Sequence, residues 1–368
     1  MRGVGAMFAA VPDPRASNAW HDLSEVLFIS FASVLCGAEN CQDMADFGRA
    51  RREALGEVLR LRHGIPSHDT FSRIFRLLDP VAFEAAFRRY MAAFAEALSG
   101  QVGLAGQVVA FDGKALAGAH ETGAKATPLH LVTAWASEQR LVLAQRLAPD
   151  RDEIAAVLDL VGLLDLEGCT VTADALHGNR KMAAAVTERG GDYVLALKAN
   201  RGPLYHATVA LLEGVAPEAE TTTPKPAHDR HEHRRAAVLP VPPDWPKRFH
   251  FAGLAALARV DTTRTTRAGQ QQSCRYFALS RPLPATEVLR VVRSHWSIEN
   301  QQHWLLDVVL AEDRARNRRD NAGTNIALLR RLALNLLQRD TLNIAIRRKI
   351  KRAAWQNDYL LTLLSQMR

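Results

Sequence analysis

Three acidic residues in this chain have surroundings that suit metal-dependent chemistry on phosphate esters. Asp112 and Asp174 each end a strand-like run, and Glu299 lies in a helix-like run that is rich in aromatic residues. Carboxylates in this arrangement can bind two hard divalent cations, which can activate water for attack on a phosphodiester. The trio therefore predicts an enzyme that cuts nucleic acid. The alternative for either aspartate alone is a structural carboxylate that caps a strand.

The order of the surrounding elements would bring the two aspartates together. Apolar periodicity predicts three strands, then helix, strand, helix and strand, at 108–111, 129–136, 141–147, 153–164, 170–173, 179–189 and 193–198. This is the element order of the ribonuclease H-like fold, in which the first strand is central and the fourth lies parallel beside it. We therefore expect an α/β catalytic core, with a mixed five-stranded sheet and helices, in which Asp112 and Asp174 are neighbours.

The remaining segments divide around this core. Residues 1–100 read as a helical N-terminal domain, in which a short helix carrying Arg73 and Arg76 would recognise DNA ends; ordinary helical packing is the alternative. The proline punctuation predicts a β-rich insertion over 201–285, with short strands at 235–239, 255–261 and 274–279. The first part of the core would then be 101–200, the helix that carries Glu299 would be 286–315, and a basic helical region would be 316–368.

Composition narrows the partners. The chain has 368 residues, 48% of them hydrophobic, and a net charge of +8. Residues 313–352 hold twelve Lys and Arg against three Asp, which suits a phosphate backbone; a solvated helical face is the alternative. The apolar stretch at 27–38 is shorter than the roughly 20 residues of a membrane helix. Four cysteines without a CxxC pair fit a reducing compartment, so we expect a cytoplasmic, nucleoid-associated protein without a membrane partner.

Several blocks, in this order over nearly the whole chain, resemble the DDE transposases of bacterial insertion sequences. The most similar branch includes the H-repeat-associated proteins linked to Rhs elements. The blocks are Leu35-Cys36-Gly37-Ala38-Glu39, Pro66-Ser67-His68-Asp69-Thr70-Phe71, Phe111-Asp112-Gly113-Lys114, His130-Leu131-Val132-Thr133-Ala134, Thr172-Ala173-Asp174-Ala175, 191–200, His295-Trp296-Ser297-Ile298-Glu299-Asn300, His303-Trp304, Leu306-Asp307 and Glu312-Asp313.

The resemblance implies a metal-dependent cut-and-join enzyme. Asp112, Asp174 and Glu299 would be the DDE triad and would hold two Mg²⁺ (or Mn²⁺). One ion would activate water, or later a DNA 3′-hydroxyl, and the other would stabilise the leaving oxygen. The partners would be double-stranded DNA, as terminal inverted repeats and as target, bound by a dimer that pairs the two ends.

Further residues are candidates for contacts with DNA. Lys114 would hold a scissile phosphate beside the metal site, unless it is a plain surface lysine; Lys198 and Asn200 would touch the backbone from the end of the strand next to that of Asp174. His295 and His303 lie four residues either side of Glu299, which predicts one shared helical face. They would orient the phosphate or the carboxylate.

A histidine- and arginine-rich run at 228–235 lies in the insertion. The family has a similar segment there, which favours DNA contact by Arg230 and Arg234; a solvated strand and a zinc site are the alternatives. Trp296 and Trp304 are expected in the core, with stacking on an unpaired base as the alternative.

Two departures from the wider family are visible. The places of the Tyr, Arg and Lys that flank the catalytic Glu in many relatives hold Val292, His295 and Leu306. The pattern Asp-Ala-Met-x-x-Gln reads Asp-Ala-Leu-His-Gly-Asn at 174–179. The leading hypothesis is an active transposase; a catalytically inactive DNA-binding relative and a stand-alone metal-dependent nuclease on the same fold are the alternatives.

Overall fold

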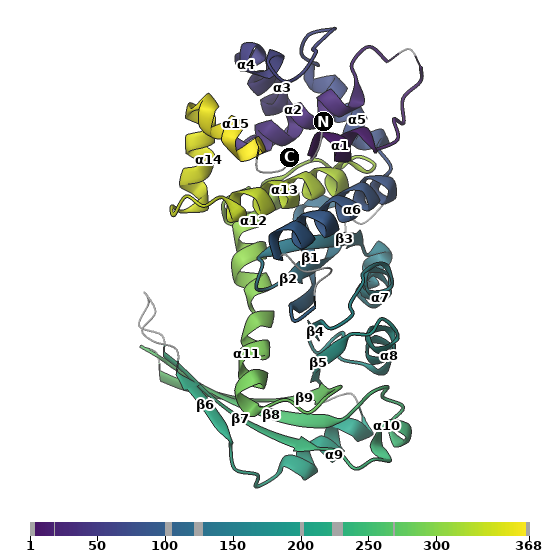
Figure 1. Cartoon of the computed structure of the whole chain (residues 1–368), viewed down its shortest axis with the longest axis vertical. Coiled ribbons are helices and arrows are strands. Elements are labelled where there is room, and N and C mark those ends of the chain that lie inside the picture. Colours follow the sequence, from purple (N-terminus) through teal and green to yellow (C-terminus); the bar gives the residue numbers. More distant parts are fainter. Residues whose placement is uncertain are drawn as a thin grey trace.

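The computed structural model is elongated, with helices at one end, a long sheet through the middle and a strand-rich region at the other end (Figure 1). It describes residues 4–17, 19–99, 105–120, 128–198, 202–222, 231–267 and 269–365. Both termini lie in the helical end, so the two ends of the chain form one part of the molecule (Figure 1).

The N-terminal part is helical, as the sequence predicts. Side-chain oxygens of Asp22, Asn40 and Ser67 accept backbone N–H bonds and so begin three of its helices. Its helices are α1 Val4–Ala9, α2 Leu23–Leu35, α3 Cys41–Ala50, α4 Arg52–Gly56, α5 His68–Leu77 and α6 Pro80–Ser99. The helix expected to recognise DNA is α5, where Arg73 is exposed while Arg76 pairs with Asp320 at 2.7 Å. End recognition by this part remains a prediction.

The middle of the molecule has the seven predicted elements in the predicted order. They are β1 Val108–His120, β2 Pro128–Ala136, β3 Leu141–Leu147, α7 Glu153–Leu163, β4 Thr170–Ala173, α8 Arg180–Glu188 and β5 Asp192–Leu197, with a short turn η1 Pro149–Arg151. β1 is antiparallel to β2 and parallel to β4, so the expected adjacency of the first and fourth strands is present. β1 is longer than predicted, and Asp112 lies within it instead of at its end.

The predicted insertion has strands, but they do not form a sheet of their own. Its elements are α9 Pro203–Leu212, β6 Ala219–Thr222, β7 His231–Pro240, α10 Trp245–Arg248, β8 Ala256–Thr266 and β9 Gly269–Leu279. β9 pairs antiparallel with β5, which gives one mixed nine-stranded sheet in the order β3-β2-β1-β4-β5-β9-β8-β7-β6 (Figure 1). The sheet therefore extends beyond the five strands that we expected.

The chain from α11 onward is helical and returns to the N-terminal end. Its elements are α11 Ala285–His295, a π-helical turn η2 Ile298–His303, α12 Trp304–Val308, η3 Glu312–Arg314, α13 Ala322–Arg339, α14 Ile346–Trp355 and α15 Asn357–Ser365. α13 packs against α2, α5 and α6 as well as β3. Arg330, Arg331 and Lys349 of the basic stretch are buried, so part of its charge is internal and cannot face a DNA backbone. Among the helices described here, none is long and apolar enough to cross a membrane.

Candidate active site

Asp112 and Asp174 directly follow the same residue pair of two neighbouring parallel strands. The last residue pair between the parallel strands β1 and β4 is Phe111 with Ala173, and the aspartates are the next residues of their chains. Asp112 continues in β1 opposite Thr133 of β2, whereas Asp174 begins a tight turn. In that turn the Oδ1 atom of Asp174 accepts the backbone N–H groups of Leu176 and His177 at 3.0 and 3.2 Å, so its carboxylate is held by its own backbone.

Glu299 approaches from a helical segment that is bonded to the sheet. It belongs to η2, directly after α11, and is exposed. The indole of Trp135 donates to Ser297 Oγ at 2.9 Å, and the amide of Gln302 donates to Thr133 Oγ1 at 3.1 Å. Thr133 is the β2 partner of Asp112. The segment that carries Glu299 is therefore fixed at the level of Asp112.

Two of the three acidic residues line one cavity. Asp174 and Glu299 face a space of about 460 Å³ that is also lined by Lys198, His295 and Arg275. Asp112 does not line this cavity, yet its carboxyl is close enough to both carboxylates to be perturbed by them. Burial, followed by the charges of Asp174 and Glu299, raises the pKa of Asp112 to about 7.

The same repulsion reaches Glu299. Although Glu299 is exposed as a residue, partial desolvation of its carboxyl and the Asp174 charge raise its pKa, while the nearby Arg275 opposes the shift. Carboxylates whose charges lie this close together form a negative site, and a divalent cation relieves such repulsion. The oxygen donors suit Mg²⁺ or Mn²⁺. In the described part of the chain, however, no three His, Cys, Asp or Glu side chains are grouped closely enough to hold a metal ion. The donors fit a metal, but a complete ligand set is not assembled.

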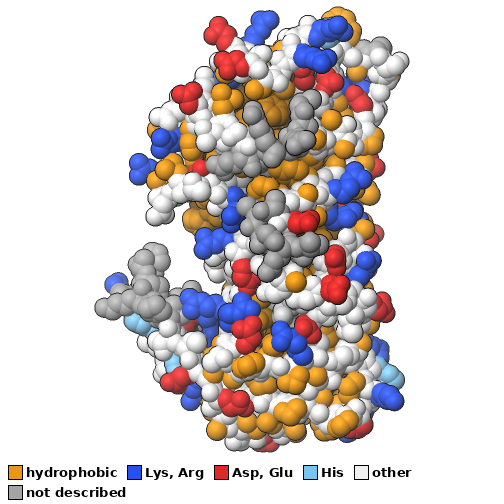
Figure 2. Space-filling view, viewed as in Figure 1, with side chains coloured by type: hydrophobic (Ala, Val, Ile, Leu, Met, Phe, Trp, Pro, Cys, Tyr) orange, Lys and Arg blue, Asp and Glu red, His pale blue; other side chains and the backbone are white. Residues whose placement is uncertain are grey.

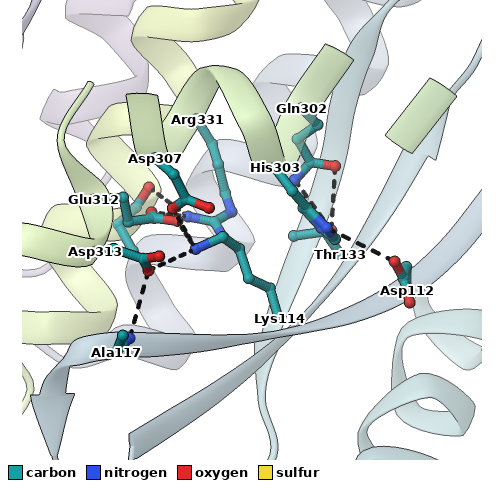
Figure 3. Close-up of polar contacts among 11 residues, drawn as sticks. Asp112, Lys114, Ala117, Thr133, Gln302, His303, Asp307, Glu312, Asp313 and Arg331 are labelled. Carbon is teal, nitrogen blue, oxygen red and sulfur yellow. Dashed lines mark hydrogen bonds and ion pairs between the residues drawn. The ribbon is translucent and has the colours of Figure 1, made fainter. Parts of the chain in front are cut away.

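The two histidines near Glu299 have different neighbours. His295 lines the cavity and its Nδ1 lies 3.2 Å from Thr172 Oγ1, whereas His303 Nδ1 lies 3.7 Å from Asp112 Oδ2 (Figure 3). The π-helical turn changes the four-residue spacing after Glu299, which the sequence did not predict. Burial lowers the pKa of His295 to about 4 and that of His303 to about 3, so both rings are neutral at pH 7.

Lys114 occupies a position that contradicts its predicted contact with a phosphate. Its side chain is 7% exposed, and its Nζ lies 2.6 Å from Asp307 Oδ1 and 3.1 Å from Asp313 Oδ1 (Figure 3). Glu312 is the third carboxylate around it, at 3.4 Å. All three partners come from the segment after Glu299, and together they enclose the ammonium. It is neither a surface lysine nor available to DNA in this structure.

The other predicted DNA contacts are divided. Lys198 is exposed and lines the cavity with Asp174. Arg234 pairs with Glu232 and lines a second cavity, of about 910 Å³, with Glu299. Burial lowers the pKa of Arg234 from its usual value, although the Glu232 charge opposes this. Asn200 and Arg230 lie outside the described residues.

Sequence analysis missed three residues of this site. Arg275 of β9 stands 4.8 Å from the ring centroid of Trp296 and lines both cavities; an arginine in a predicted strand gave no signal. Trp296 is half-buried and lines both cavities, and Trp304 is 55% exposed, so neither tryptophan is the core residue that the sequence predicted. Glu153, at the start of α7, has its Oε1 atom 2.8 Å from His130 Nδ1, within hydrogen-bond distance, and adds to the negative field at Asp112. His177 lies between Glu153 and Asp174, at 3.8 and 3.9 Å. The sequence pointed toward this group only through the family block around His130 and the departure at 174–179, which includes His177.

The chain belongs to the DDE transposase family. The family model described as "Transposase DDE domain" matches residues 104–336, and the one described as "DDE_Tnp_1-associated" matches residues 6–91. The predicted resemblance is thereby confirmed. "Putative transposase YncI" of Escherichia coli O157:H7 is 32% identical and is matched over 97% of this chain and 93% of its own length.

Two further similarities cover the chain almost completely. "H repeat-associated putative transposase YhhI" of Escherichia coli (strain K12) is 30% identical, over 96% of each chain. Among solved structures, the cryo-EM structure of a piggyBac transposase synaptic complex with hairpin DNA matches 98% of this chain and 77% of that chain. The TM-score is 0.42 and the sequence identity is 11%.

Proposed function

We propose that this protein catalyses metal-dependent cleavage and strand transfer at the ends of an insertion sequence, with Asp112, Asp174 and Glu299 as its catalytic triad. The observation that carries the proposal is the last residue pair between β1 and β4, Phe111 with Ala173, which the two aspartates directly follow. Glu299 faces them from a segment that is hydrogen-bonded to the neighbouring strand β2. The strand order β3-β2-β1-β4-β5 supports a ribonuclease H-like core within the larger sheet.

The side chains around the triad suit this chemistry. Bound Mg²⁺ or Mn²⁺ would supply a nucleophile at neutral pH and stabilise the leaving oxygen. The three carboxylates would hold the ions, and the neutral ring of His303 would keep Asp112 from turning away. Lys198, Arg234 and Arg275 line the cavities next to Glu299 and would bind the phosphates of the DNA strand.

The DNA would be held from both sides of this site. Figure 2 shows Lys and Arg side chains gathered beside the hollow between the helical end and strands β6–β8. The N-terminal helices would recognise the terminal inverted repeats, and two copies of the protein would pair the two ends. The pairing follows from the proposed reaction, because strand transfer joins two ends to one target.

The test uses labelled DNA that carries the end of the protein's own element. We expect Asp112→Asn, Asp174→Asn and Glu299→Gln each to lower metal-dependent cleavage on the order of 1000-fold, because the triad acts as a unit. Glu287→Gln is the matched control, since Glu287 is a carboxylate of the adjacent helix α11 that pairs with Arg290 away from the cavities.

The products decide the class of enzyme. Joined end–target products support a transposase, whereas cleavage without joining supports a nuclease. Specific binding without cleavage in either Mg²⁺ or Mn²⁺ would support an inactive DNA-binding relative. Equal activity of the three variants and the control would refute the triad.

A further inference from the structure

The buried ion cluster around Lys114 has a place in the molecule that bears on the site. Lys114 lies on β1 two residues after Asp112, and its ammonium contacts Asp307, Glu312 and Asp313 (Figure 3). Asp307 belongs to α12, which continues directly from the turn that carries Glu299. One lysine therefore joins the strand of the first acidic residue to the segment of the third.

The cluster is anchored on its far side by α13. Arg331 Nη1 lies 2.7 Å from Glu312 Oε1, and both side chains have no exposed surface. Buried charges are costly to remove from water unless each is paired, so the cluster tolerates only arrangements that keep its contacts. It thus restricts where residues 307–313 can lie relative to β1.

A contact without charges fixes the same segment to the same strand. At Gly118 of β1, an added Cβ atom would lie 2.4 Å from the carbonyl oxygen of Ala315 and 2.6 Å from that of Asp313. Only glycine permits the backbone of this segment to approach β1 so closely. The position of the segment is therefore built into the backbone as well as the ion cluster.

We propose that Lys114 is a positioning residue that, by pairing with Asp307 and Asp313, holds the Glu299-bearing segment in place over Asp112. The proposal rests on the proposed function of the triad. It assigns to Lys114 no contact with DNA, because its ammonium would have to leave three carboxylates to reach a phosphate. It also accounts for the Asp307 and Glu312-Asp313 block, to which the proposed chemistry gives no part.

The experiment compares two buried lysines. Lys349 is 4% exposed, donates to the carbonyl oxygens of Leu337 and Asp340, and pairs with the Asp340 carboxylate at 3.2 Å. It lies on α14, outside the site. Lys114→Met and Lys349→Met therefore remove the same kind of group, and both should lower thermal stability.

Only Lys114→Met should change the site. We expect amide hydrogen exchange within 298–313 to become about tenfold faster in the metal-free variant, because a local contact is lost. We also expect cleavage to fall at least about tenfold while the dissociation constant for the DNA end in metal-free buffer and its salt dependence stay as in the wild type. Lys349→Met should leave exchange in this segment and cleavage per folded molecule unchanged.

A variant with balanced charge keeps the test decisive if Lys114→Met does not fold. Lys114→Met with Asp307→Asn removes one charge of each sign, leaves Glu312 paired with Arg331, and should still show faster exchange in 298–313. Unchanged exchange in either folded variant overturns the proposal. The proposal is also overturned if the slope of log affinity for DNA against log salt concentration is lower by about one in the variant, because that would indicate a lost phosphate contact.

The two proposals fail separately. Hydrogen exchange reports on the segment without DNA or metal, so it tests the positioning role even if the wild-type protein does not cleave. Absence of cleavage in the wild type, with faster exchange in Lys114→Met, would contradict only the proposed function.

Discussion

At Asp112 the chain places a carboxyl group among conditions that disfavour its charge. The side chain is largely buried, Asp174 and Glu299 add negative charge, and the ring of His303, 3.7 Å away, is neutral at pH 7. The backbone N–H of Gly113 donates to it at 3.0 Å but does not offset the other effects. Because these carboxylates repel one another, binding of a cation should stabilise the site strongly.

The raised pKa of Asp112 has a consequence for the stability of the metal-free protein. Its folded-state pKa, about 7, lies above the ordinary value of 3.8, so the folded protein binds this proton more tightly than the unfolded chain does. The contribution to the free energy of unfolding is fully present below pH 3.8 and is lost as the pH rises to about 7. We therefore expect Asp112→Asn to match the wild type near pH 4 and to be more stable by about 4 kcal/mol at pH 8.

Urea unfolding in the presence of a chelator at several pH values measures this difference. The exposed Asp150 provides the matched control, and Asp150→Asn should show no such trend with pH. A stability difference between Asp112→Asn and the wild type that is the same at pH 4 and pH 8 would contradict the assigned electrostatics.

At the scale of elements, the π-helical turn η2 sets the relation between Glu299 and His303. The backbone N–H of Trp304 bonds to the carbonyl of Glu299, five residues earlier, which widens the turn. As a result Glu299 lines the cavity while His303 lies against Asp112. The helical periodicity used on the sequence assumes 3.6 residues per turn, so it could not anticipate this change of face.

Deleting one residue of this turn tests its importance. Removing Asn300 should let the segment close as an ordinary α-helix and rotate Glu299 by about 100° relative to His303. We expect cleavage to be lost while the helical circular dichroism signal and DNA-end binding are retained. Asn300→Ala is the control, because Asn300 is exposed and its side chain bonds only to the carbonyl of Trp296 among the described residues. Full cleavage by the deletion variant would mean that the π-helical turn is incidental.

The strands differ in how well the sequence predicted them. β4 matches its prediction because Thr170–Ala173 is a short run buried on both faces, bounded by turns. β1 extends to His120, beyond its predicted end. The sequence did not predict this extension because residues 113–119 are rich in Gly and Ala, which have little strand propensity. Here pairing with β2 overrides propensity. The sequence could not predict the partners of Lys114 either. All three lie near residue 310, far from Lys114 along the chain, and only the tertiary fold brings them to β1.

At the scale of the whole molecule, the continuous sheet joins the insertion to the candidate active site. The sequence indicated the strands of the insertion, but not that β9 pairs with β5, because distant strand pairing leaves no local pattern. This pairing carries Arg234, Arg264 and Arg275 on β7, β8 and β9 to the cavity lined by Glu299. Of the two basic regions that the sequence indicated, the run at 228–235 contributes Arg234 to this cavity, while part of the C-terminal charge is buried.

The salt dependence of DNA binding distinguishes the two basic regions. If the strand passes through the cavity beside Glu299, each phosphate contact contributes about 0.9 to the slope of log affinity against log salt concentration. We expect Arg234→Gln, Arg264→Gln and Arg275→Gln together to lower that slope by about two to three in a titration of the DNA end. Arg348→Gln, at an exposed position of α14, should leave it nearly unchanged. The opposite pattern would place the DNA over the C-terminal helices, where it could not reach Glu299 through this cavity.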